Sequence, residues 1–270
     1  MELLLGLYMA APTPITSLQR GLQVLGAIQR SSAMSFTELR EEIGLPKATL
    51  ARLLHTLTAS GWIRRQGSRG RYVCETWAGL ERDAQDRASK IARLAQSACT
   101  QVQRIVPWPI NLGMREGASM IIIDPPGAVV MGLAANYRQL GFRPPMLRSS
   151  LGLCYMAFCP EAEQLEILHK LQRSPDEFDQ AVLHSGKLSH RLKEIRRQGY
   201  ALRDVSIVPV NSAERYGAIA VPIASSKQLY ACLSCSWLLQ ITSTEEILRS
   251  CLKPMQDAAR SVARGLGELE

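Results

Sequence analysis

The sequence predicts an α+β protein with two parts, a group of helices closed by a β-hairpin and a larger mixture of hairpins and helices. Apolar residues recur at helical spacing in three segments before residue 60, and two short strand-like runs follow at 62–64 and 71–73. Further along, alternating runs are separated by short turns and by helical segments. Antiparallel hairpins separated by helices favour a mixed layer over a doubly wound parallel sheet.

Length and composition fit a folded protein of two moderate domains. The chain has 270 residues, of which 46% are hydrophobic and 21% are charged, a balance typical of globular domains. Its net charge of +8 favours an anionic partner. The positive charge is concentrated, because residues 45–75 carry six Lys and Arg residues against a single acid, Glu75.

The cysteines and the opening segment indicate a reduced compartment. Seven cysteines are an odd number, and the opening "MELLLGLYMAA" has Glu2 where a secretory signal would have a basic residue. Its apolar run is also too short to cross a bilayer. We therefore expect a cytoplasmic protein with free thiols and no membrane association.

The first two helices are expected at 16–29 and 35–43. The first carries an apolar stripe formed by Leu18, Leu22, Leu25 and Ile28. The second begins at Ser35, whose hydroxyl suits an N-cap, and Glu38 lies at the position of a capping-box partner.

A tight turn separates the second helix from a third. Gly44 suits the left-handed backbone that ends a helix, and Pro46 suits the first turn of the next one. The third helix has an apolar face formed by Leu50, Leu53, Leu54 and Leu57. The opposite face is small, polar and basic, and comprises Ala48, Ala51, Arg52 and His55, flanked by Lys47, Thr49 and Thr56.

A hairpin follows the third helix, with strands expected at 62–64 and 71–73 and a loop at 66–70 that contains two glycines. Three helices followed by a hairpin is the order of a winged helix-turn-helix. In such a unit the second helix of the motif enters the major groove of double-stranded DNA. Candidate DNA-binding residues on the third helix are Lys47, Ala48, Thr49, Arg52, His55 and Thr56. Candidate wing contacts are Arg64, Arg65, Arg69 and Arg71. The alternative is a three-helix packing unit with a solvated basic face.

Residues 77–103 are polar and helical in pattern, and we expect a connector helix there. The region that follows combines two hairpins, with turns at 115–117 and 225–228, and several helices. The expected helices are 151–158, 161–171, 181–198 and a last one from Ser243 towards Leu269, kinked at Pro254. The expected domains are 1–76, 77–103 and 104–270.

Several segments resemble the IclR family of bacterial transcription regulators. In the N-terminal part these segments are "SLQRGLQVLGAI", "FTELREEIGLPKATLARLLHTLTASGWIRR" and "RYVC". The resemblance continues through "RSSLGLCYMAFCP", "IRRQGYALRD" and "AIAVPIASSKQLYACLSCSW", and so covers nearly the whole chain. Within the family, "VPWPINLGMREGASMIIID" and "LGLCYMAFCP" are most similar to regulators of aromatic-acid catabolism, such as hydroxyphenylpropionate degradation.

The resemblance implies a C-terminal effector-binding domain of GAF-like α/β fold, a homodimer or homotetramer, and a small organic acid as effector. Independently, Ser149 and Ser150 begin an apolar helix, and a helix N-terminus suits a carboxylate. The effector-binding residues carried over by motif are Ser150, Leu151, Gly152, Asp204, Ser234 and Ser236. Trp108 and Met114 are candidates for an apolar wall, and Arg203 is an alternative partner for a carboxylate. Many members have Lys or Arg after the glycine, whereas Leu153 and Cys154 follow here.

The sequence gives little support for catalysis or metal binding. Cys232 and Cys235 have the spacing of a redox or zinc motif, but no second pair accompanies them, and residues three apart on a strand face opposite sides. There is no G-x-S-x-G, P-loop or carboxylate pair. We expect no enzyme activity, no cofactor and no metal, and a ligand-responsive, sequence-specific DNA-binding regulator. One alternative is a thiol-based redox sensor or small-molecule enzyme with a basic docking domain, and another is a structural nucleoid protein that binds DNA without sequence preference.

Overall fold

The computed structural model describes residues 14–31, 33–66, 70–75, 82–123, 143–204, 216–226 and 228–268. The chain divides into two compact units, Met1–Ala78 and Gly79–Glu270. Among the described helices, none combines the length and the apolar character needed to span a membrane.

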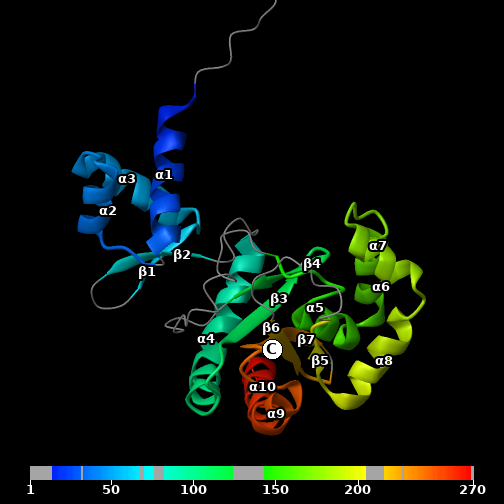
Figure 1. Ribbon diagram of the computed structural model, residues 1–270. Helices are drawn as coiled ribbons and strands as arrows, with labels where there is room; N and C mark the ends of the chain where they lie inside the picture. Colours follow the sequence, from blue (N-terminus) through cyan, green and yellow to red (C-terminus); the bar gives the residue numbers. More distant parts are fainter. Residues whose placement is uncertain are drawn as a thin grey trace, which may run out of the picture. The chain divides into compact units, whose positions relative to one another are not determined.

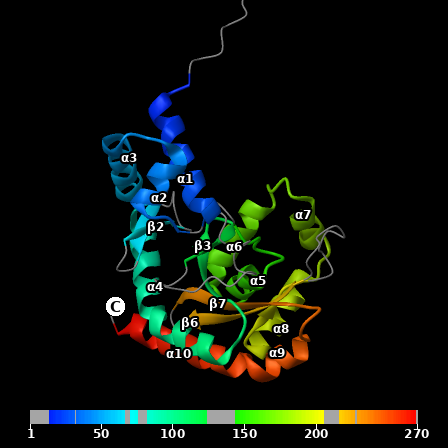
Figure 2. The same ribbon diagram turned by 60° about the vertical axis from the view of Figure 1, so that its left-hand side comes forward.

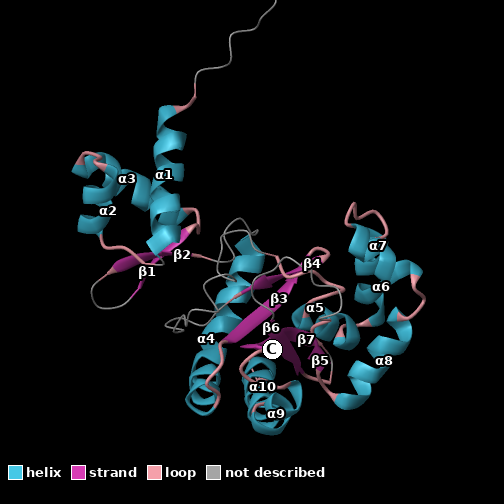
Figure 3. Ribbon diagram, in the orientation of Figure 1, coloured by secondary structure: helices cyan, strands magenta, loops and turns pink. Residues whose placement is uncertain are grey.

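The first unit is three helices followed by a hairpin, as Figure 3 shows. Its elements are α1 (Thr16–Ser31), α2 (Phe36–Ile43), α3 (Lys47–Ala59), β1 (Ile63–Gln66) and β2 (Arg71–Cys74). The strands pair antiparallel, with Ile63 opposite Cys74. This order confirms the helix-turn-helix unit that the sequence predicts.

The turn between α2 and α3 follows the predicted chemistry. The Ser35 hydroxyl accepts a hydrogen bond from the Glu38 N–H at 3.3 Å, and the Glu38 carboxylate accepts one from the Ser35 N–H at 2.7 Å. Gly44 ends α2 with φ of 71°, in the left-handed region that costs glycine least. The two short helices are therefore held apart by local hydrogen bonds and backbone geometry.

The predicted apolar stripe of α1 is only half buried. Leu25 and Ile28 lie in the core of the unit together with Leu39 of α2 and Leu50 of α3. Leu18 and Leu22, with Ile15 just before the helix, are 58%, 59% and 67% exposed. The first two turns of α1 thus present apolar side chains to the surface of this unit.

The second unit is built on one five-stranded antiparallel sheet of order β4-β3-β7-β6-β5. Its strands are β3 (Ile110–Glu116), β4 (Ser119–Ile122), β5 (Ala201–Leu202), β6 (Tyr216–Ala224) and β7 (Leu229–Leu238). Its helices are α4 (Arg82–Ile105), α5 (Ser150–Phe158), α6 (Glu161–Leu171), α7 (Glu177–His184), α8 (Leu188–Gln198), α9 (Thr244–Ser250) and α10 (Leu252–Gly267). The mixed helix and sheet layer confirms the predicted α+β class.

Helices cover both faces of this sheet. The apolar helix α5 packs against β6 and β7 on one face and also contacts α8. The amphipathic helices α4 and α10 pack against each other and against the other face, as Figures 1 and 2 show. The predicted connector helix is therefore part of the second unit, where it buries Ala88, Ile91 and Ala95.

Two predicted helices of the second unit are broken in the structure. The segment 181–198 contains the end of α7 and all of α8, separated at Gly186, which has φ of 68°. The last helix is interrupted at Cys251, so Pro254 lies in the first turn of α10 instead of within a kinked helix. A proline there loses no helical hydrogen bond.

Candidate nucleic-acid interface and anion site

The outer face of α3 is open in the first unit. Leu50 and Leu54 are buried beneath the helix, at 0% and 2% exposure. Thr49 is half-buried, and the side chains on the outside are Lys47, Ala48, Arg52, His55 and Thr56. Pro46 is the N-cap residue and provides no side-chain cap, so the first N–H groups of α3 are available to an anion.

The predicted wing arginines differ in what they contact. Arg64 Nε lies 2.8 Å from a carboxylate oxygen of Glu75, and Arg71 Nη2 lies 2.8 Å from one of Glu38. Arg65 is exposed, has no acidic partner in the part of the chain that is described, and its guanidinium lies 5.7 Å from the centre of the Tyr72 ring. Arg69 lies outside the described residues.

Arg71 is consequently a structural residue of the hairpin and not a free phosphate ligand. Its guanidinium also donates to the Ala33 carbonyl at 2.8 Å, and so ties β2 to the start of α2. The ion pair and the Ser35 hydrogen bonds lower the pKa of Glu38. Residues 38 and 71 are far apart in sequence, so no local pattern could have revealed this pair.

Glu75 is a buried acid at the end of the hairpin. It is 7% exposed, and burial raises its pKa to about 7, although the positive charge of Arg64 opposes the shift. Arg64 lies within ion-pair distance of this acid, which reduces its availability to DNA.

In the second unit, the predicted effector residues gather at the start of α5. The Ser149 hydroxyl caps the helix, accepting from the Gly152 N–H at 3.0 Å and donating to the Pro145 carbonyl at 2.7 Å. Ser150 is 3% exposed, and the Asp204 N–H donates to the Arg148 carbonyl at 3.3 Å. This places Asp204 beside the same helix end.

Ser234 and Ser236 lie on the face of the sheet that α5 covers. Cys232 hydrogen-bonds with Cys154 of α5, and side chains two and four residues further along a strand share its face. Both serines are nearly fully buried, and the Ser234 hydroxyl donates to the Asn111 carbonyl at 3.4 Å.

Two arginines flank the start of α5. Arg203 lies with its guanidinium 3.6 Å from the centre of the Tyr216 ring, and burial together with the charge of Arg148 lowers its pKa to about 10. Arg148 donates to Asp176 at 2.6 Å, while its buried Nε has no hydrogen-bond partner in the described part of the chain. Arg203 has no acidic partner within the described ranges, and a helix N-terminus with an unpaired cation nearby is an arrangement that favours an anion.

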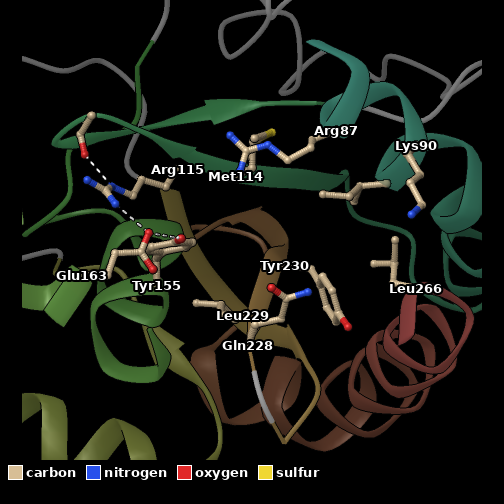
Figure 4. A pocket seen from close by; sticks show the side chains of 12 residues that line it. Arg87, Lys90, Met114, Arg115, Tyr155, Glu163, Gln228, Leu229, Tyr230 and Leu266 are labelled. Atoms are coloured by element: carbon tan, nitrogen blue, oxygen red, sulfur yellow. Dashed lines mark hydrogen bonds and ion pairs between the residues drawn. The ribbon is translucent and has the colours of Figure 1, made fainter. Parts of the chain in front are cut away.

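The apolar wall is not assembled as predicted. A Cβ at Gly113 would lie 3.0 Å from Leu151 of α5, so Met114, the next residue of β3, faces the opposite side of the sheet. Figure 4 shows Met114 near Arg87, and both line a cavity whose lining does not include Ser234. Trp108 is half-buried before β3, where its carbonyl accepts from Gln103 at 3.0 Å. The correction follows from strand alternation.

The cysteines of the C-x-x-C segment point to opposite faces of the sheet. Cys232 pairs with Cys154, whereas Cys235 hydrogen-bonds with Cys251 at the junction of α9 and α10. Desolvation raises the pKa of Cys154, and the hydrogen bond with Cys251 raises that of Cys235. No group of three or more metal-ligating side chains occurs among the described residues.

Comparison with known proteins assigns both units. The profile of the IclR helix-turn-helix domain matches residues 17–67, and that of the bacterial transcriptional regulator IclR C-terminal domain matches residues 86–264. The HTH-type transcriptional regulator XynR of Escherichia coli K12 is 26% identical over 256 residues, covering 94% of this chain and 98% of that protein. The transcriptional repressor IclR of the same organism is 25% identical and covers 70% of this chain and 69% of its own length.

Solved structures share the fold. An IclR family transcriptional regulator from Brucella abortus aligns with a TM-score of 0.52 and 22% identity, covering 94% of this chain and 93% of that one. An IclR homologue from Microbacterium hydrocarbonoxydans, complexed with 4-hydroxybenzoate, aligns with a TM-score of 0.50 and 22% identity, covering 93% and 99%. At this identity the similarity establishes the fold alone.

Proposed function

The chain belongs to the IclR family of bacterial transcriptional regulators, and we propose that it binds a specific DNA operator and controls a catabolic operon in response to a small organic acid. The observation that carries the DNA-binding part is the open outer face of α3. That face is narrow at its start, because Ala48 and Thr49 are small, and positive at Lys47 and Arg52.

In this proposal α3 lies in the major groove. Arg52 reads a base edge, for which guanine is the usual partner of arginine. Lys47 and the uncapped N–H groups at the start of α3 contact phosphate. Arg65 on the wing adds a phosphate contact that depends on salt but not on sequence.

Apolar exposure on α1 supports a homodimer. Ile15, Leu18 and Leu22 form one stripe at helical spacing, and each is more than half exposed in this unit. A second copy that covers this stripe would remove apolar surface from water. Two copies of α3 would then contact half-sites about one helical turn apart, and a homotetramer would pair two such dimers.

The effector in this proposal is a carboxylate held at the start of α5. Its negative charge meets Arg203, Arg148 and the N–H groups of Ser150 and Leu151. In this proposal, Ser234 and Ser236 form the part of the site that the sheet provides. Asp204 lies at the edge of the site. The 4-hydroxybenzoate bound by the Microbacterium homologue supports an aromatic acid as the effector.

The recognition helix is tested with Arg52→Ala in the full-length protein. Duplexes selected from a random pool by the wild type serve as operator probes, and binding is measured by fluorescence anisotropy. We expect Arg52→Ala to weaken binding by about 1–3 kcal/mol and to relax the preference for one base pair of each half-site. Arg173→Ala, which removes an exposed arginine of the second unit, is the control and should bind like the wild type. Unchanged affinity and base preference in Arg52→Ala would refute the assignment.

A further inference from the structure

A cavity opens where two central strands of the sheet separate. The ladder between β3 and β7 ends at the pair Gly113 and Cys232, although β3 continues to pair with β4. The space left between the strands is about 360 Å³, a size that accommodates small ligands. Its lining includes Arg87, Lys90, Met114, Arg115, Leu229 and Leu266.

At one end of the cavity, the positive charge is paired with carboxylates. Arg115 lies 2.6 Å from Glu163 and 2.7 Å from Glu166, and the Tyr155 hydroxyl donates to Glu163 at 2.8 Å. Figure 4 shows Arg115, Glu163 and Tyr155 grouped on one side. The charge of Arg115 is therefore balanced by protein carboxylates.

The other end carries positive charge without such balance. Arg87 and Lys90 come from the first three turns of α4, and neither forms an ion pair with any residue in the described ranges. Asp83 and Asp86, the nearby acids on α4, are exposed. Figure 4 shows Lys90, Tyr230 and Leu266 together on this side.

Apolar side chains form part of the surface between the two ends. Ile91, Met114, Leu229 and Leu266 are each less than 9% exposed and come from both sides of the sheet. A ligand that fits must therefore combine one negative group with an apolar body, since a small inorganic anion would leave the apolar wall uncovered.

We propose that this cavity is a second ligand site, distinct from the start of α5, and that it binds a carboxylate with an apolar body. The positive charges of Arg87 and Lys90 attract the carboxylate, and the apolar body lies against Met114, Leu229 and Leu266. The two sites share no residue. Arg87 and Lys90 lie just after the segment that joins the two units, so the ligand fixes the start of α4 against β3 and β7.

The test is calorimetric titration of the full-length protein with benzoate, 3-phenylpropanoate and octanoate, with 3-phenylpropanamide as the uncharged comparison. The double variant Arg87→Met with Lys90→Met removes the cations of the second site, and Arg203→Met removes one from the site at α5. Arg93→Met is the matched control, because Arg93 is an exposed arginine of α4 that does not line the cavity. Circular dichroism shows whether each variant is folded.

We expect at least one of the three carboxylates to bind at two sites in the wild type. The double variant should weaken one of these sites by about tenfold or more, as expected for losing charge-assisted contacts. Arg203→Met should weaken only the other, and Arg93→Met neither. The proposal is overturned if no carboxylate binds more weakly to the folded double variant than to the wild type, or if the amide binds this site equally well. Either result leaves the DNA-binding function untouched, since that is tested by Arg52→Ala.

Discussion

The starts of α3 and α5 are two helix ends with positive charge nearby, and they differ in burial. Lys47 and Arg52 are exposed on α3, whose N-terminus has no side-chain cap. At α5, Ser149 caps the helix and Ser150 is 3% exposed. An open helix end accepts phosphates spaced along a polymer, whereas an enclosed end selects a carboxylate by size. In the proposed function, the same local feature, a helix N-terminus, binds different ligands according to its surroundings.

The first prediction concerns Gly152, the third residue of α5, where alanine would add one methyl group. In Gly152→Ala the new Cβ would lie 2.5 Å from the Met146 Cα and even closer to the Met146 carbonyl oxygen. Backbone atoms have to shift, so we expect a loss of about 1–3 kcal/mol in the unfolding free energy and weaker carboxylate binding. Urea denaturation and calorimetry measure the two effects.

Thr49→Ala is the matching change at the third residue of α3. It removes a half-buried hydroxyl from an open helix end, and should leave the unfolding free energy nearly unchanged while weakening operator binding by about 1 kcal/mol. If Gly152→Ala and Thr49→Ala lowered the unfolding free energy equally, the start of α5 would not be more enclosed than the start of α3.

The helix end at α3 could be predicted from the sequence because its determinants are local. Ser35, Glu38, Gly44 and Pro46 lie within one short stretch, and each has a defined role in ending or beginning a helix. The mixed α+β class also followed from the alternation of strand and helix periods. The leucines of α3 take the buried and partly buried positions predicted for them.

The surroundings of both sites could not be predicted, since they depend on residues distant in sequence. Arg71 is paired with Glu38, and Arg203 meets Tyr216 and Arg148 only after the sheet has formed. The side of the sheet on which Met114 lies is set by strand register, which the sequence pattern did not fix. Sequence reasoning could not specify the partners of each cation.

The second prediction concerns Arg203, a cation that lies near the start of α5. Arg203→Met should weaken carboxylate binding at α5 by about 1.5–3 kcal/mol, because a charge-assisted contact in a partly buried site is lost. Operator binding without effector should be unchanged. Arg197→Met, an exposed change on α8, is the control. If Arg203→Met binds carboxylates like the wild type, Arg203 is not a contact of the anion.

The third prediction concerns Glu75, the buried acid of the hairpin. Its pKa is about 7 in the folded protein against an ordinary value of 4.5. Between pH 4.5 and 7 the folded state holds a proton that the unfolded state has released, so the unfolding free energy falls as pH rises through this window. This pKa shift should lower the unfolding free energy by on the order of 1–3 kcal/mol between pH 4.5 and pH 7.5.

Glu75→Gln should remove this pH dependence, and urea denaturation at pH 5 and pH 8 measures it. The same substitution releases Arg64, so operator binding should become more sensitive to salt by roughly one counterion. Glu42→Gln, at an exposed acid paired with Arg30, is the control for both measurements. If the wild type and Glu75→Gln lose equal stability between pH 5 and pH 8, Glu75 is not the group that titrates.

The smallest effect distinguishes two arginines of the hairpin. Arg65→Ala should weaken binding to every DNA sequence by a similar factor and reduce the salt dependence of log K by roughly 1, because one phosphate contact is lost. Arg71→Ala should leave that slope unchanged and lower the melting temperature slightly, because its guanidinium is held by Glu38 and the Ala33 carbonyl. Anisotropy titrations at several salt concentrations measure both slopes. An equal reduction of the slope by Arg71→Ala would mean that Arg71 leaves Glu38 for phosphate when DNA binds, and would place it among the contacts of the wing.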